Sequence, residues 1–122
     1  MKIAIIGAGG IARKVYFPLL GCWPGIEITG LYSRTQETID QVSREWGFTN
    51  GTTDINHILE SKPDAAIVLS STETHYHFCR LFLENGVDVY SEKSLTPTSK
   101  ESFELGQIAE KQNRILAVGF NR

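Results

Sequence analysis

The sequence predicts an α/β protein: a Rossmann-type, doubly wound parallel sheet that forms a single three-layer α/β/α domain. Short apolar runs alternate along the chain with longer stretches of helical spacing, a pattern typical of parallel sheets with crossover helices. The first apolar run ends at a glycine-rich turn that leads directly into a helical stretch. Because 122 residues are enough for one compact domain and too few for two, one domain is expected over residues 1–122.

Strands are expected where short apolar runs are bounded by turn residues. These runs cover residues 2–6, 26–32, 52–53, 65–69, 87–90 and 115–118. Helices are expected where apolar residues recur every three or four positions. These stretches cover residues 11–20, 35–46, 54–60, 74–85 and 99–112. The alternation implies one parallel sheet with right-handed crossovers.

Several helix boundaries are explained by a particular residue. Pro18 is expected to end or kink the first helix, because proline lacks the N–H group that a helix interior uses. The side chains of Thr35 and Asp54 are suited to cap the helices that follow them. Gly47 and Gly86 are expected to end two helices, because glycine readily adopts the left-handed conformation found there.

The composition argues against several classes of protein. A net charge of −2 gives no reason to expect nucleic acid or an anionic membrane as a partner. No apolar run approaches the roughly 20 residues that a membrane span needs, and the first residues lack a signal-peptide pattern, so a cytoplasmic location is expected. Cys22 and Cys79 are expected to be free thiols, with one disulfide as the alternative. No metal site is expected, because neither cysteine has a CxxC partner and two helical histidines, His75 and His77, point to different faces.

The turn after the first strand matches the pattern G-x-G-x-x-A. Its residues are Gly7, Ala8, Gly9, Gly10, Ile11 and Ala12. Gly7 allows a tight turn, Gly9 lets the backbone approach a pyrophosphate, and Ala12 lets the helix pack close to the strand. The helix start then offers free N–H groups to the phosphates of a dinucleotide. The alternatives are a glycine-rich turn without a ligand, or a site for another nucleotide such as a sugar nucleotide or S-adenosylmethionine.

The residues after the second strand bear on the choice of cofactor. An NAD-binding domain usually has Asp or Glu at this point for the ribose 2′-hydroxyl, but this chain has Ser33 and Arg34. A serine hydroxyl can donate to a 2′-phosphate, and a guanidinium can pair with it and lie over the adenine. NADP is therefore favoured over NAD. The alternative is that Arg34 is a solvated surface residue and NAD binds without a carboxylate.

Three further segments complete a family resemblance. They read Ser70-Ser71-Thr72-Glu73-Thr74-His75, Glu92-Lys93-Ser94 and Ala117-Val118-Gly119-Phe120-Asn121-Arg122. With the glycine turn, they occur in the order and at roughly the spacing of the N-terminal domain of the Gfo/Idh/MocA oxidoreductases, which the whole chain resembles.

The resemblance implies roles for several of these residues. Ser70, Ser71 and Thr72 would lie beside the nicotinamide ribose, with His75 at the head of the next helix as a further cofactor contact. Glu92 and Lys93 match the family's Glu-Lys-Pro motif, so Lys93 would lie near the nicotinamide, position the substrate and aid proton transfer. Ser94 replaces the family's proline, and this replacement is expected to remove a rigid bend and a cis peptide bond. The structural alternatives are a capped loop for Ser70 to Thr72, a packing role for His75 and a solvated side chain for Lys93.

Family members continue into a second α/β domain that completes the substrate pocket, and this chain is expected to lack it. The resulting hypothesis is a cofactor-binding domain of an oxidoreductase that transfers hydride to or from a sugar- or polyol-like carbon, with little activity by itself. An apolar face left exposed would favour a homodimer. The rival hypothesis is a non-catalytic dinucleotide-binding module that acts as a sensor or structural subunit.

Overall fold

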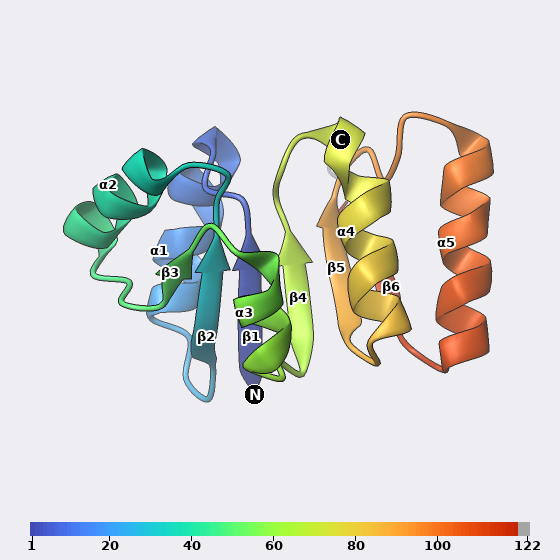
Figure 1. Cartoon of the computed structure of the whole chain (residues 1–122), viewed down its shortest axis with the longest axis horizontal. Helices are drawn as coiled ribbons and strands as arrows, with labels where there is room; N and C mark the ends of the chain where they lie inside the picture. The colour runs from blue at the N-terminus through green and yellow to red at the C-terminus, as the bar shows by residue number, and fades with distance from the viewer. Residues whose placement is uncertain (120–122) are drawn as a thin grey trace.

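The computed structural model describes residues 1–119 and shows a single six-stranded sheet (Figure 1). Its strands are β1 (Lys2–Ile6), β2 (Glu27–Tyr32), β3 (Gly51–Thr52), β4 (Ala65–Val68), β5 (Asp88–Glu92) and β6 (Leu116–Gly119). They lie in the order β3-β2-β1-β4-β5-β6, and every neighbouring pair is parallel. The predicted doubly wound parallel sheet is therefore confirmed.

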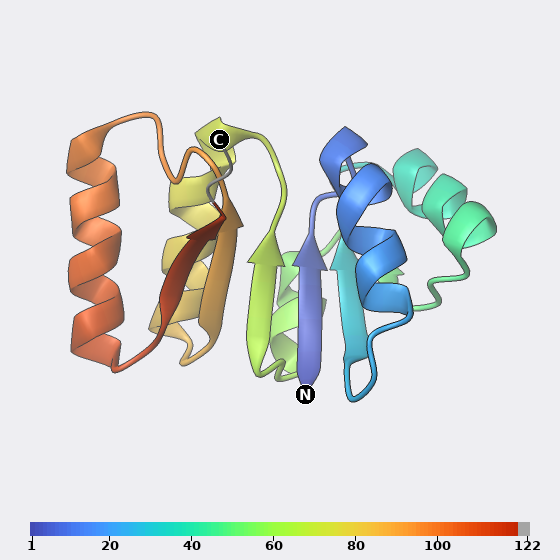
Figure 2. The same cartoon turned by 180° about the vertical axis from the view of Figure 1, so that it is seen from behind.

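Helices cover both faces of this sheet. They are η1 (Ala12–Tyr16), α1 (Phe17–Gly21), α2 (Gln36–Trp46), α3 (Ile55–Glu60), α4 (Thr72–Glu84) and α5 (Ser99–Gln112). Helices α3, α4 and α5 lie on the face seen in Figure 1, and α1 lies on the opposite face, seen in Figure 2. Helix α2 contributes Val42 to the same apolar cluster as α1, which completes the third layer.

The strands supply two separate cores because successive side chains point to opposite faces. Ala4 and Ile6 of β1 pack with α3, α4 and α5, whereas Ile3 and Ile5 pack with α1 and α2. Burial on both faces explains why β1 is apolar along most of its length. This central strand therefore fixes the position of the turn that follows it.

The first helix continues past Pro18 to Gly21, one residue beyond its predicted range, and Pro18 lies in the first turn of α1. The preceding segment η1 is a wider π-helical turn, in which the Phe17 N–H donates to the Ala12 carbonyl five residues earlier. Because proline has no N–H and crowds the carbonyl four residues before it, we attribute the continuation of the helix to this widened turn.

The other predicted boundaries are close to those observed. The side chains of Thr35 and Asp54 accept N–H bonds as expected, and Gly47 and Gly86 have φ values of 75° and 76°. Helix α4 begins at Thr72, two residues earlier than predicted. The first strand and the last helix match their predicted ranges, the remaining elements are displaced by one or two residues, and β5 extends to include Glu92.

Two further findings concern the cysteines and membrane-spanning helices. The two cysteines are free as predicted, Cys22 exposed and Cys79 buried beneath α4. Burial raises the pKa of the Cys79 thiol to about 12, which makes it an inert core residue. Within residues 1–119, no helix is both long and apolar enough to cross a membrane.

Candidate functional site

The strand order creates a crevice at the carboxyl ends of β1 and β4. From β1 the chain crosses toward β2 and β3, whereas from β4 it crosses toward β5 and β6, so the connections diverge at this point. A hollow of about 390 Å³ lies there. It is lined by Gly7, Tyr32, Ser33, Arg34, Ser70, Ser71, Thr74 and Phe78. The structure thus brings together residues from three segments that the sequence analysis singled out separately.

Gly7 is required by the geometry of this crevice. Its φ is +105°, and its N–H donates to the Tyr32 carbonyl at 2.8 Å. A Cβ at this position would lie 2.7 Å from the backbone nitrogen of Ser70. Any side chain would therefore force the β1 turn away from the β4 turn, so glycine sets the width of the crevice floor.

The rest of the glycine turn separates into buried and open residues. Ala8 and Ala12 are buried, and Ala12 packs in the cluster beneath α1 as its small size predicts. Gly9, Gly10 and Ile11 are exposed, and a Cβ at either glycine would meet nothing within 4 Å. The outward side of the turn is thus open to a ligand.

Arg13 supports the turn from behind, a role that the sequence analysis missed. Its Nε donates to the Ala8 carbonyl at 3.0 Å, and its two terminal nitrogens reach Gln41 and Glu45 of α2 at 3.1 and 3.6 Å. The guanidinium therefore connects the turn to α2. Because its partners lie on a distant helix, nothing in the local sequence indicates this contact.

Ser33 and Arg34 lie where β2 ends. Ser33 is 9% exposed, and its N–H donates to the Thr52 carbonyl at 3.2 Å. Arg34 is exposed and lines the hollow beside it. The described residues that line the hollow include no Asp or Glu, so its formal charge is positive.

The turn after β4 forms the opposite wall. The Thr74 hydroxyl lies 2.7 Å from both the Ser70 Oγ and the Ser71 carbonyl oxygen. Ser71 occupies the N-cap position of α4 without a capping bond from its side chain, and Thr72 is the first residue of the helix. Thr74 is a lining residue that the sequence analysis assigned only to a helix.

Glu92 and Lys93 lie at the end of β5, outside the lining of the hollow. The Tyr16 hydroxyl donates to Glu92 Oε1 at 2.5 Å and lies 3.1 Å from the Tyr90 hydroxyl. The Lys93 N–H donates to Glu92 Oε2 at 3.2 Å, and its side chain is exposed. Burial and the bond to Glu92 raise the pKa of Tyr16, so this phenol holds its proton.

The peptide bond between Lys93 and Ser94 is cis. The expectation that replacing the family's proline by Ser94 removes a cis bond is therefore wrong.

His75 is buried, with 1% of its surface exposed. Its Nε2 lies 2.8 Å from the Ser70 carbonyl oxygen. Its Nδ1 lies 2.9 Å from the Ser94 carbonyl oxygen and 3.1 Å from that of Leu95. Both ring nitrogens are thus occupied by protein atoms, and the side chain does not line the hollow.

Sequence similarity to known proteins agrees with a nucleotide-binding role for this crevice. The model of a protein family described as an oxidoreductase family with an NAD-binding Rossmann fold, GFO_IDH_MocA, matches residues 1–120. The chain belongs to the Gfo/Idh/MocA family. It is therefore an NAD-binding Rossmann domain of oxidoreductase type, as the resemblance implied.

Individual relatives of this Gfo/Idh/MocA domain include oxidoreductases of known structure or activity. The chain is 32% identical to the Salmonella typhimurium protein named "Putative oxidoreductase YceM" over all 122 residues, which is 39% of that protein. It is 28% identical to scyllo-inositol 2-dehydrogenase (NAD(+)) of Bacillus subtilis, covering 36% of it. A crystal structure of a Gfo/Idh/MocA oxidoreductase from Vibrio cholerae superimposes with a TM-score of 0.92 at 33% identity, over 98% of this chain and 38% of that one. The chain thus spans well under half the length of these relatives.

The structure describes only part of the last segment that carries the family resemblance, Ala117 to Arg122. Ala117, Val118 and Gly119 belong to β6, whereas residues 120–122 lie outside the described part of the chain.

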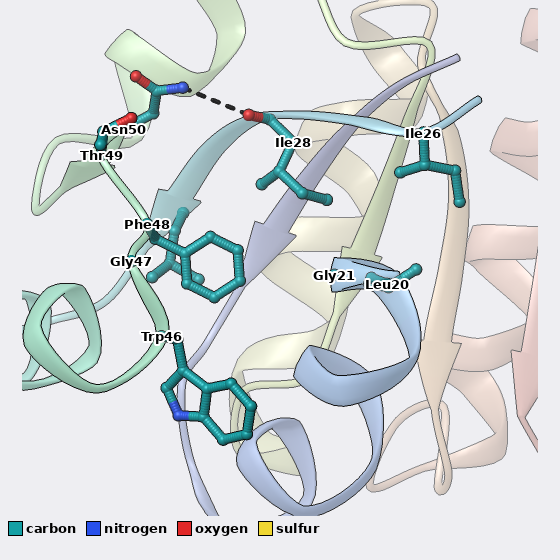
Figure 3. A pocket seen from close by; sticks show the side chains of 10 residues that line it. Leu20, Gly21, Ile26, Ile28, Trp46, Gly47, Phe48, Thr49 and Asn50 are labelled. Carbon is teal, nitrogen blue, oxygen red and sulfur yellow. Dashed lines mark hydrogen bonds between the residues drawn. The ribbon is translucent and has the colours of Figure 1, made fainter. Parts of the chain in front are cut away.

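A second hollow, of about 310 Å³, lies between the end of α1, the start of β2 and the segment after α2 (Figure 3). The rings of Trp46 and Phe48 form one wall, and Leu20 lies opposite them. The Asn50 amide donates to the Ile28 carbonyl at its edge, at 3.3 Å. The described residues that line it have no titratable side chain, so it offers no group for acid–base chemistry.

Proposed function

We propose that this chain is the cofactor-binding part of an NADP-preferring oxidoreductase that moves hydride between a nicotinamide cofactor and a sugar- or polyol-like carbon. The observation that carries the proposal is the hollow at the ends of β1 and β4. It combines the Gly7 turn with Ser33 and Arg34, without a carboxylate among its described lining residues. Family membership supports the oxidoreductase class.

The residues present fit a dinucleotide. Without a Cβ at Gly7, the β1 and β4 turns approach closely, and the open side of the turn leaves room for a pyrophosphate. The helix that follows directs its amino end to the same place, where N–H groups favour an anion. We assign the cofactor contacts to Gly7, Ala8, Gly9, Gly10, Ile11, Ala12, Ser33, Arg34, Ser70, Ser71, Thr72, Glu92 and Lys93.

The preference for NADP rests on the positions of Ser33 and Arg34. A carboxylate at the end of β2 would accept from a ribose 2′-hydroxyl and repel a 2′-phosphate, whereas a guanidinium attracts the phosphate. Arg34 is exposed at the edge of the hollow, so it is free to turn toward a ligand bound there.

Lys93 is our candidate for the catalytic residue. When bound, the nicotinamide supplies the hydride acceptor or donor. As an alcohol carbon loses hydride, its hydroxyl must lose a proton, and a lysine amine can accept it or hold the oxygen by donating to it. The exposed Lys93 side chain lies one residue after β5 and is supported by its backbone bond to Glu92.

The substrate class is supported by the name of the relative that acts on scyllo-inositol, of which this chain covers 36%. Because hydride transfer needs substrate and cofactor held in a closed site, we expect weak or no turnover from these 122 residues alone. Ile11, Val15 and Leu19 are 40–44% exposed along one helix, which supports self-association into a homodimer. Free thiols at both cysteines support a cytoplasmic location.

Calorimetric titration with NADPH and NADH tests the cofactor proposal. We expect NADPH to bind at least about tenfold more tightly, since a charge-assisted pair is worth roughly 1.5–3 kcal/mol. Arg34→Ala should remove most of this advantage and weaken NADH binding by much less, because only the contact with the adenine is then lost. Arg44→Ala is the matched control, because it removes the same charge from an exposed site on α2 outside the hollow.

Two results would contradict parts of this proposal. Equal or tighter binding of NADH would overturn the NADP preference, and binding of neither cofactor would overturn the assignment of the site. Tight NADPH binding by a longer protein that oxidises no polyol would instead favour a non-catalytic dinucleotide-binding module. The replacement of the family's proline by Ser94, next to the candidate catalytic lysine, gives that rival its motivation.

A further inference from the structure

His75 connects the two loops that border the candidate nicotinamide end of the site. On one side its Nε2 contacts the Ser70 carbonyl, which belongs to the turn after β4. On the other its Nδ1 contacts the Ser94 and Leu95 carbonyls and lies 3.2 Å from the Ser91 hydroxyl, all at the end of β5 or just after it. One buried ring therefore reaches both loops.

The atoms around the His75 ring indicate which hydrogen bonds it can make. Nε2 faces the carbonyl oxygen of Ser70, which only accepts, so a proton on Nε2 makes this contact a hydrogen bond. Nδ1 can then accept from the Ser91 hydroxyl, or, if it also carries a proton, donate to the Ser94 carbonyl. The first arrangement bonds the Ser70 turn to the end of β5, and the second bonds it to the loop that follows β5.

The hydrogen bonds of the sheet do not make this connection. The pairing of β4 with β5 ends at Val68 and Ser91, so the loops that follow are not joined by strand hydrogen bonds. Ser70 lines the hollow, and Ser94 adjoins Lys93. The separation of these two loops determines the space available to a ring bound between them.

We propose that His75 is a positioning residue: it holds the Ser70 turn and the Lys93 loop at a fixed separation that fits the nicotinamide half of the cofactor. It does so without touching the cofactor, since its ring is buried and both nitrogens are occupied. This inference rests on the proposed function and adds a role that differs from direct cofactor contact. It also separates His75 from the Gly7 turn, which would serve the phosphates.

The test compares a whole dinucleotide with the part of it that lacks nicotinamide. His75→Phe keeps a ring of similar size and removes both nitrogen contacts. His77→Phe is the control, because it makes the same exchange on the exposed face of α4 two residues away. The ligands are NADPH and 2′-phospho-ADP-ribose, or NADH and ADP-ribose if the wild-type chain prefers NADH.

We expect His75→Phe to bind the dinucleotide about tenfold more weakly and to bind the ADP-ribose ligand within about twofold of wild type. His75→Gln retains one amide donor and should lose about threefold, and His77→Phe should match wild type. If the phenylalanine variant does not fold, as judged by circular dichroism, the same comparison is made with His75→Gln.

Two other outcomes overturn the inference and are distinguishable. Equal loss of both ligands in His75→Phe and His75→Gln indicates a general packing role, and no loss of either indicates no role. If the wild-type chain binds neither the dinucleotide nor its fragment, the proposed function fails first and the positioning role fails with it.

Discussion

The two halves of the sheet form the candidate site in different ways. In the half made of β1, β2 and β3, the critical surface is backbone: Gly7 brings the β1 turn against Ser70, and its conformation leaves no room for a side chain. In the half made of β4, β5 and β6, side chains hold the loops, with His75 on one face and Tyr16 bonded to Glu92 on the other. A single carbon added at Gly7 should disrupt the first half of the site. Removing one side-chain contact should weaken the second half only in part.

The halves also differ in how they are covered. Figure 2 shows α1 in front of β2 and next to β1, while the same side of β5 and β6 has no helix within residues 1–119. On that side, Tyr16 reaches from η1 to Tyr90 and Glu92. This contact therefore connects the well-covered half to the less covered one.

The largest effect is expected for Gly7→Ala. An alanine there would have a positive φ and a Cβ 2.7 Å from a backbone nitrogen, so we expect a loss of about 3 kcal/mol or more in the free energy of unfolding. Urea denaturation measures this loss, and dinucleotide binding should disappear with it.

Gly9→Ala is the matched control for this change. Its Cβ would meet nothing within 4 Å, so stability should be unchanged or raised by up to about 1 kcal/mol. Weaker dinucleotide binding by this stable variant would support close approach of the pyrophosphate to Gly9. A Gly7→Ala protein as stable as wild type would contradict the contrast between a backbone-defined and a side-chain-defined half.

The same contrast explains what the sequence could predict. Thr35 and Asp54 cap helices within three residues of their own position, so their roles follow from local chemistry. Gly7 is marked by a turn motif in the local sequence, although the backbone that excludes a Cβ there belongs to Ser70. His75 contacts carbonyl groups about 20 residues away, and their positions depend on how β4 and β5 pair. The π-helical turn before Pro18 was likewise missed, because proline favours a helix end unless the preceding turn widens.

A smaller effect is expected where the two halves meet, at Tyr16. Tyr16→Phe removes a hydrogen bond to the Glu92 carboxylate, and because the pair is only partly buried we expect a loss of about 1 kcal/mol in the free energy of unfolding. Tyr76→Phe, which removes a comparable bond to Glu104 on the surface between α4 and α5, is the control and should lose less.

The pH dependence of this difference has a definite sign. The pKa of Tyr16 is raised in the folded protein, so above the ordinary tyrosine value of 10.0 the unfolded phenol ionises while the folded one keeps its proton. Wild-type stability then falls as pH rises, and the gap between wild type and Tyr16→Phe should narrow. A gap that widens above this pH would contradict the assignment of Tyr16 as the donor.

The smallest effects are expected for one helix cap in each half, and they test whether the halves unfold together. The side chain of Thr35 accepts from the Thr38 N–H at 3.3 Å, and that of Thr98 accepts from the Glu101 N–H at 3.2 Å. Because both bonds are long and exposed, replacing either threonine by alanine should cost about 0.5 kcal/mol, the low end for a lost helix cap. Because β1 pairs with β4 along the middle of one continuous sheet, both variants should lower the midpoint of a single thermal transition by similar amounts. Two transitions, with each variant shifting only one, would show instead that the backbone-defined half and the side-chain-defined half are separate cooperative units, and the Tyr16 contact would then be too weak to couple them.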